Sequence, residues 1–187
     1  MNLLLGSQSP RRQELLQMLG LPFTIVNINC EEHFPSHLKR EDIPVFLSEQ
    51  KADAYHRHLQ EDDVLLTADT IVWVEHLQQM LGKPSSIAHA KQMIKTLSGR
   101  THQVYTGVHL RSLKKKMSFS CRTDVSFRTL TEEEIDYYVR NYHPLDKAGA
   151  YGIQEWIGAA ACTSINGSYF NVMGLPTDHV WEALKEF

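Results

Sequence analysis

The first part of the chain alternates short apolar runs with helix-start signals, and this alternation restricts the fold more than any other feature. Met1 to Leu5 is an apolar run typical of a buried strand. Ser9-Pro10 then supplies an N-cap residue followed by proline, which predicts a helix that runs to Leu19 and stops at Gly20. Phe23 to Asn27 is a second strand candidate. Strands that alternate with helices build a sheet covered by helices, so we expect an α/β fold.

The middle of the chain continues this alternation. Asp42-Ile43-Pro44 begins a second helix, and Ser86 to Leu97 has the pattern of a third. Between them, Val64 to Ala68 and Ile71 to Val74 are apolar and rich in β-branched residues. The polar pair Asp69-Thr70 separates these two runs. We therefore expect two strand pieces with a break between them.

The later part of the chain favours antiparallel strands. Gln103 to Leu110 and Met117 to Phe127 are typical of a long hairpin around the basic turn Lys114-Lys115-Lys116. Asn166-Gly167 stands where a tight turn would join two further short strands. Parallel strands early and antiparallel strands late predict a mixed sheet.

Two more helices are expected near the end of the chain. Thr131 and Glu134 form a capping box for a helix that reaches about Asn141, and a last helix covers Thr177 to Leu184. No repeat, low-complexity stretch or linker marks a domain boundary, so residues 1–187 are expected to form a single domain.

Composition narrows the class of protein. The chain has 19 Lys and Arg against 22 Asp and Glu, a formal net charge of -3, which argues against nucleic acid as a partner. The first residues turn polar too early for a secretory signal, and no apolar run is long enough to span a membrane. The cysteines, Cys30, Cys121 and Cys162, are odd in number and lack paired spacing, which favours reduced thiols in the cytoplasm.

Arginine is unusually placed at the start of the first helix. Ser7 and Ser9 precede Arg11 and Arg12, so two cations lie at a helix terminus that is already electropositive. A bound polyphosphate would turn this unfavourable arrangement into a favourable one, because backbone N-H groups, hydroxyls and guanidinium groups would converge on it. An ordinary capped helix with exposed arginines is the alternative.

Carboxylates and cations also recur around the third strand region. Asp69 follows an apolar run, at the kind of strand end where open α/β sheets hold ligands. Glu31-Glu32 and Lys51 precede it, and Lys83 follows in Gly82-Lys83-Pro84. Carboxylates can hold a hard cation while lysines balance phosphate charge. A simple turn residue is the alternative for Asp69.

The third candidate segment is Asp146 to Gln154, which is rich in small residues. Glycine and alanine let a backbone approach a ligand closely. Gln154 can both donate and accept hydrogen bonds, so it could pair with the edge of a pyrimidine base. A surface turn is the alternative.

Taken in order, these segments resemble the successive motifs of the Maf nucleotide pyrophosphatases. The resemblance covers nearly the whole chain and implies an α/β fold of the Maf/ITPase-like type, a single elongated domain with a mixed twisted β-sheet flanked by helices. The motifs are Ser7-Gln8-Ser9-Pro10-Arg11-Arg12, Ala68-Asp69-Thr70, Gly82-Lys83-Pro84, Leu97-Ser98-Gly99-Arg100-Thr101-His102, Asp146 to Gln154, Ile165-Asn166-Gly167-Ser168-Tyr169 and Gly174-Leu175-Pro176.

The resemblance implies an activity and a set of site residues. The Lys147 to Gln154 motif resembles that of the family branch that hydrolyses dTTP and UTP to the monophosphate and pyrophosphate. The resemblance also implies modified UTP as a further substrate, a house-cleaning role and Mg²⁺ or Mn²⁺ as the cofactor. Relatives often form homodimers, so the resemblance is compatible with a homodimer of this chain. The implied roles are catalysis by Asp69, base selection by Arg11, Thr70 and Gln154, phosphate binding by Ser7, Ser9, Arg12, Lys51 and Lys83, and metal binding by Glu32 and Asp69, with the register between Glu31 and Glu32 open.

One departure and several alternatives accompany this interpretation. Glu155 follows Gln154 where many relatives have glycine, which affects the expected rim of the base pocket. A sister branch that acts on methylated guanine nucleotides and a non-catalytic nucleotide sensor of cell division are the competing functions. His33 and His37 are spaced one helical turn apart, but no zinc-binding motif accompanies them.

Overall fold

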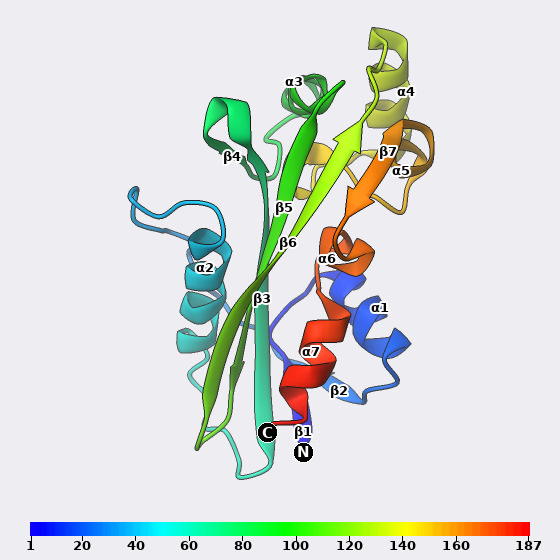
Figure 1. Cartoon of the computed structure of the whole chain (residues 1–187). Coiled ribbons are helices and arrows are strands. Elements are labelled where there is room, and N and C mark those ends of the chain that lie inside the picture. Colours follow the sequence, from blue (N-terminus) through cyan, green and yellow to red (C-terminus); the bar gives the residue numbers. More distant parts are fainter. The chain divides into compact units, whose positions relative to one another are not determined.

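The protein is described by a computed structural model of residues 1–187, whose strands join one mixed sheet (Figure 1). The strand order is β2-β1-β3-β5-β6-β7, with β4 paired to β3. The strands are β1 (Asn2–Leu5), β2 (Phe23–Ile25), β3 (Asp63–Val74), β4 (Gln79–Leu81), β5 (Thr101–Arg111), β6 (Lys116–Phe127) and β7 (Cys162–Asn166). The helices are α1 (Pro10–Met18), α2 (Asp42–Asp53), α3 (Ile87–Leu97), α4 (Glu132–Tyr142), α5 (Trp156–Ala161), α6 (Tyr169–Met173) and α7 (Thr177–Leu184), with 3-10 turns at Glu75–Leu77 and Ala148–Ala150.

The chain divides into two units, and β3, β5 and β6 contribute residues to both. The first unit comprises residues 1–70, 106–121 and 174–187, and the second comprises residues 71–105 and 122–173. The predicted α/β class and the mixed sheet flanked by helices are confirmed. The assignment of residues 1–187 to one domain stays a prediction.

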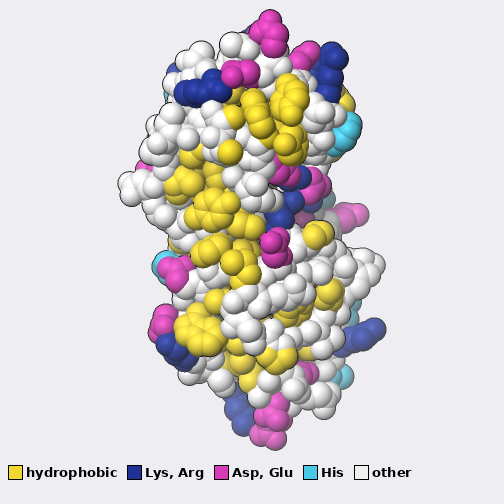
Figure 2. Space-filling model, turned by 90° about the vertical axis from the view of Figure 1, so that its right-hand side faces the viewer, with side chains coloured by type: hydrophobic (Ala, Val, Ile, Leu, Met, Phe, Trp, Pro, Cys, Tyr) yellow, Lys and Arg dark blue, Asp and Glu magenta, His cyan; other side chains and the backbone are white.

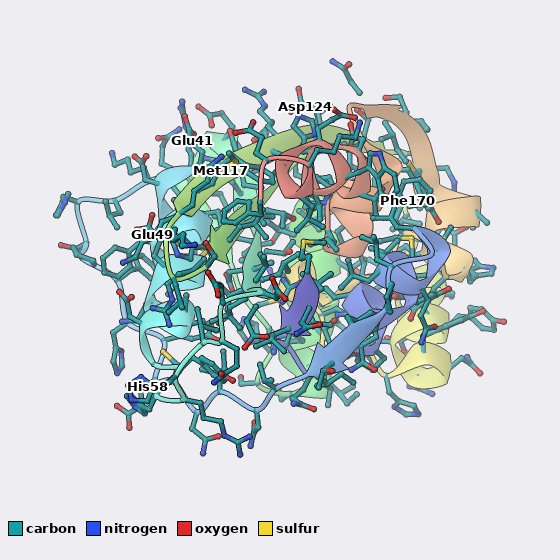
Figure 3. All side chains as sticks on the ribbon, turned by 90° about the horizontal axis from the view of Figure 1, so that it is seen from below. Glu41, Glu49, His58, Met117, Asp124 and Phe170 are labelled. Carbon is teal, nitrogen blue, oxygen red and sulfur yellow. The ribbon has the colours of Figure 1, made fainter.

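In the first unit, parallel strands carry helices on both faces. Leu3 of β1 pairs in parallel register with Phe23 of β2 and with Val64 of β3. Helix α2 lies on one side of these strands and α1 on the other, as two views show (Figures 1 and 3). Helix α2 packs so closely on β5 that a Cβ at Gly107 would lie 2.2 Å from the carbonyl carbon of Pro44. Glycine at this position therefore permits the helix that carries Lys51 to lie directly on the sheet.

A polar contact also joins α2 to the β5–β6 hairpin within this unit. The hydroxyl of Ser118 donates to a carboxylate oxygen of Glu49 at 2.7 Å, and Figure 3 labels Glu49 together with Met117 next to that serine. The hairpin itself was predicted, and its turn closes where the amide of Ser112 donates to the carbonyl of Lys115 at 2.9 Å.

In the second unit, antiparallel pairing dominates. Val72 of β3 pairs with Leu81 of β4, and Val125 of β6 pairs with Ile165 of β7. Helix α4 begins with the predicted capping box, in which the Thr131 side chain accepts from the Glu134 amide while the Glu134 side chain accepts from the Thr131 amide. Local capping signals thus located this helix correctly.

Two element predictions were wrong. The strand pieces around Asp69-Thr70 are one continuous strand, β3, so Asp69 lies inside a strand and not at its end. The break is absent because both polar side chains find partners from other elements and the backbone ladder can continue. Asn166-Gly167 does not join two strands, since β7 is followed by α6, at whose start the Ser168 hydroxyl accepts from the Asn171 amide at 3.3 Å.

The surface shows interspersed charges. On the face drawn in Figure 2, lysine and arginine side chains stand beside acidic ones, and neither sign covers an extended region. None of the helices has both the length and the apolar character that crossing a bilayer requires. The three cysteines are unpaired, and Cys121 is buried.

Candidate active site

The centre of the candidate site is an ion cluster in which one ammonium group contacts two carboxylates. Lys51 Nζ lies 2.5 Å from Asp69 Oδ1 and 3.0 Å from Glu32 Oε1. The side chains of Lys51 and Asp69 are only 15% and 13% exposed, whereas that of Glu32 is 50% exposed. Because an isolated buried charge is strongly disfavoured, the contact between Lys51 and Asp69 stabilises both of these poorly solvated charges. The cluster therefore opens to solvent on the side of Glu32.

The elements that carry this cluster are fastened together just beside it. The hydroxyl of Thr67 on β3 donates to the carbonyl of Ser48 on α2 at 2.7 Å, and both residues are fully buried. Ser48 precedes Lys51 by less than one helical turn, and Thr67 precedes Asp69 by two strand positions, so it faces the same side of the sheet. This bond therefore fixes the register between Asp69 and Lys51.

The geometry distinguishes the two neighbouring glutamates. Glu32 pairs with Lys51, while Glu31 lies near His33 at 3.6 Å with its side chain 93% exposed. Glu32 is therefore the one of the two that joins the cluster.

Arg12 is held beside this cluster by three hydrogen bonds. Its Nε donates to the carbonyl of Gly174 at 2.9 Å, Nη1 donates to Ser7 Oγ at 3.2 Å, and Nη2 donates to Thr70 Oγ1 at 3.1 Å. Burial lowers the pKa of Arg12, and the negative charge of Asp69 opposes this effect. Each Nη nitrogen keeps a second hydrogen for another acceptor. Arg12 is thus a fixed cation and remains able to bind an anion.

The start of α1 is chemically suited to an anion. Ser9 is the N-cap residue as predicted, but its side chain makes no capping hydrogen bond. The first turn contains no acidic residue, and Arg11 there is half-buried. Uncapped N-H groups and a positive dipole end favour a bound phosphate. Ser7 lies at this end, and its hydroxyl accepts from the Ser9 amide at 3.3 Å.

Thr70 has a partner that the sequence interpretation did not identify. Its hydroxyl lies 3.0 Å from that of Thr106 on β5, in addition to its contact with Arg12. The pair is separated by 36 positions along the chain, so no local pattern could have indicated it.

The remaining predicted residues, Lys83 and Gln154, belong to the second unit. Both side chains are exposed. The loop that precedes Gln154 is anchored where the Gly149 amide donates to the carbonyl of Gly82, next to Lys83, at 3.0 Å. Residues 149–153 are buried, so this glycine-bearing segment is not a simple surface turn. Glu155, the departure from the family pattern, turns inward and pairs with Lys147.

Comparison with known proteins identifies the family of this chain. The family model described as Maf-like protein matches residues 2–187. The chain therefore belongs to the Maf-like protein family.

Individual relatives carry more specific names. A protein named dTTP/UTP pyrophosphatase from Phocaeicola vulgatus is 48% identical over 185 residues, which cover 98% of this chain and 95% of that protein. A protein of the same name from Flavobacterium johnsoniae is 47% identical and covers 97% and 93% of the two chains. A solved nucleoside-triphosphatase / dITP/XTP pyrophosphatase from Mycobacterium abscessus is 16% identical with a TM-score of 0.44, over 76% of this chain and 96% of that one.

Proposed function

We propose that this protein hydrolyses pyrimidine nucleoside triphosphates, namely dTTP, UTP and modified UTP, to the monophosphate and pyrophosphate, in a house-cleaning role. The names of relatives that are 48% and 47% identical over almost the whole chain support the substrate class. The observation that carries the proposal is the contact of Lys51 with both Asp69 and Glu32, at 2.5 and 3.0 Å. In this proposal the cluster would supply a base, a phosphate-binding cation and carboxylate ligands for a metal ion.

The donor set fits Mg²⁺ or Mn²⁺. Asp69 and Glu32 supply carboxylate oxygens, and no group of three or more His, Cys, Asp or Glu side chains in the chain could enclose a metal ion. Mg²⁺ is commonly held by one or two carboxylates together with substrate phosphates and water, so two ligands are sufficient. When bound, the cation would neutralise phosphate charge and make water more acidic.

The chain's own residues would divide the remaining work. Asp69 would accept the proton of the water that attacks the α-phosphorus. Lys51, Lys83 and Arg12 would balance the charge of the leaving pyrophosphate, together with the uncapped helix start at Ser7 and Ser9. Base selection is assigned to Arg11, Thr70 and Gln154.

We also propose the cytoplasm as the location and a nucleotide as the only ligand besides the metal ion, with neither nucleic acid nor membrane involved. A homodimer is part of the same proposal, and light scattering of the purified protein would test it.

A pyrophosphate-release assay over all canonical and several modified nucleoside triphosphates, with and without Mg²⁺ or Mn²⁺, tests the function. We expect cation-dependent release from dTTP and UTP. Release confined to methylated GTP would assign the protein to the sister branch. Saturable binding with no product under excess Mg²⁺ would identify a sensor and contradict the proposal.

A further inference from the structure

A buried tyrosine hydroxyl closes the loop that carries Gln154. Tyr138 of α4 is fully buried, and its hydroxyl accepts from the Gly152 amide at 2.9 Å. The same hydroxyl donates to Oε2 of Glu155. One side chain thus holds the residues on both sides of Gln154, which itself is exposed.

A poorly solvated ion pair secures the same loop from its other end. Lys147 Nζ lies 3.1 Å from Glu155 Oε1 and 2.7 Å from Asp146 Oδ1. The side chains of Lys147 and Glu155 are only 11% and 18% exposed. Removing Lys147 would leave the Glu155 carboxylate without a cation in a place that water reaches poorly, which is strongly unfavourable, whereas Lys147 without Glu155 would keep Asp146 as its partner. The pair therefore ties the beginning of the loop to the residue just after Gln154.

The backbone leaves this loop little freedom. The Glu155 amide donates to the Gly152 carbonyl at 3.0 Å, which forms a tight turn with Gln154 inside it. A Cβ at Gly152 would lie 2.8 Å from the Glu155 carboxyl carbon, and a Cβ at Gly158 would lie 1.7 Å from the Ile153 carbonyl oxygen. The turn is therefore tightly packed at both glycines.

We propose that Tyr138 and Glu155 are positioning residues that set base preference by fixing the orientation of Gln154. This inference rests on the proposed function, in which Gln154 contacts the base. Uracil and cytosine differ by the exchange of one donor and one acceptor on the pairing edge. A glutamine amide carries one donor group and one acceptor, so it distinguishes these bases only if its orientation is fixed. A loop free to turn would offer either group to either base.

The hydroxyl of Tyr138 keeps its proton, which it must do to donate the hydrogen bond to Glu155. Burial is the main cause that raises its pKa, and the hydrogen bond to Glu155 adds to the effect. The ring stacks on Tyr142 with centroids 5.1 Å apart and on Trp156 at 6.4 Å. Tyr138→Phe would therefore retain the packing and remove only the hydroxyl and its two hydrogen bonds.

The test compares Tyr138→Phe with the matched control Tyr142→Phe, which alters a stacked neighbour on the same helix. kcat and KM are measured for UTP and CTP in each protein, and hydrogen exchange is followed over residues 152–156. In Tyr138→Phe we expect the UTP-to-CTP ratio of kcat/KM to fall by about tenfold or more. KM for UTP should rise more than kcat falls, and the loop amides should exchange faster. Tyr142→Phe should match the wild type in the UTP-to-CTP ratio, in KM for UTP and in the exchange of the loop amides.

A second variant keeps the inference testable if Tyr138→Phe folds poorly. Glu155→Gln retains an acceptor for Tyr138 but removes the charge that pairs with Lys147, so it should give an intermediate loss of preference. An unchanged UTP-to-CTP ratio in a folded variant whose loop exchanges faster would overturn the inference and leave the proposed function intact. A wild-type protein that hydrolyses no pyrimidine nucleotide would instead contradict the proposed function, and this inference with it.

Discussion

Lys51 Nζ lies 2.5 Å from Asp69 Oδ1, and this contact joins helix α2 to the interior of strand β3. The same ammonium lies 3.0 Å from Glu32, so one cation serves two carboxylates. A lysine in this position keeps two negative charges together in the absence of a ligand. Phosphate oxygens brought near the cluster would compete for the same ammonium group.

Lys51→Met should reduce both activity and stability. It leaves Asp69, whose side chain is 13% exposed, without its cation, and we expect a loss of about 2 kcal/mol in the free energy of unfolding. kcat/KM for UTP should fall by about 10²-fold or more, because a charge that stabilises the transition state is lost. Urea unfolding and pyrophosphate release measure the two effects. Lys39→Met, at an exposed position, should leave both values near those of the wild type; an equal loss there would contradict the interpretation.

Arg12→Lys should not be a conservative change. The three donors of Arg12 reach Gly174, Ser7 and Thr70 in different directions, and a single ammonium cannot replace this fork. We expect a loss of about 1–3 kcal/mol in unfolding free energy together with a higher KM for the nucleotide. Arg57→Lys at an exposed position is the control. Wild-type stability and KM in Arg12→Lys would show that these bonds are dispensable.

Gly149→Ala should destabilise the loop before Gln154. Gly149 has φ of 68°, and an added Cβ would lie 2.8 Å from Cγ2 of Val72. The unfavourable backbone conformation and this clash together should cost about 1–3 kcal/mol of unfolding free energy. Gly82→Ala is the matched control, because nothing lies within 4 Å of its added Cβ. Similar melting temperatures for the two variants would count against this account.

Stability should depend on pH through His102. Burial lowers the pKa of His102 from 6.5 to about 3. Its buried Nδ1 has no hydrogen-bond partner, so a proton added there would find no acceptor. The unfolded chain therefore takes up this proton below pH about 6.5 while the folded protein does not until pH about 3. The stability that His102 contributes is complete above pH about 6.5 and is lost progressively as the pH falls towards about 3.

The measurement is urea unfolding between pH 4 and pH 8 for the wild type and His102→Gln. The stability advantage of the wild type should shrink as the pH falls, since the variant lacks this proton uptake. His33→Gln, at an exposed position, is the control for the His-to-Gln substitution itself. If the difference in unfolding free energy between the wild type and His102→Gln stays constant with pH, His102 is not the source of the pH dependence.

Local signals predicted much of the fold. The capping box at Thr131 and the Ser9-Pro10 helix start located two helices, because each signal involves residues within one helical turn, and the apolar pattern located α3. Helix α5 was missed, since its six residues follow directly on the Gln154 loop and present no capping pattern.

Features that depend on distant partners could not be predicted. The continuity of β3 through Asp69 depends on Lys51, which is 18 positions away, and the closure of the Gln154 loop depends on Tyr138, 17 positions before Glu155. The roles of the site residues came from the resemblance to a family. The structure adds which of them contact one another within each unit, and the roles themselves stay predictions.

The most direct test of the central claim is pyrophosphate release from UTP and dTTP by Asp69→Asn in the presence of Mg²⁺. Asp63→Asn is the control, since Asp63 begins the same strand, is equally buried at 9% exposure and lies outside the ion cluster. We predict that Asp69→Asn folds but loses about 10²- to 10⁴-fold in kcat, while Asp63→Asn retains activity. Near-normal turnover in folded Asp69→Asn would contradict the assignment of Asp69 as the catalytic base.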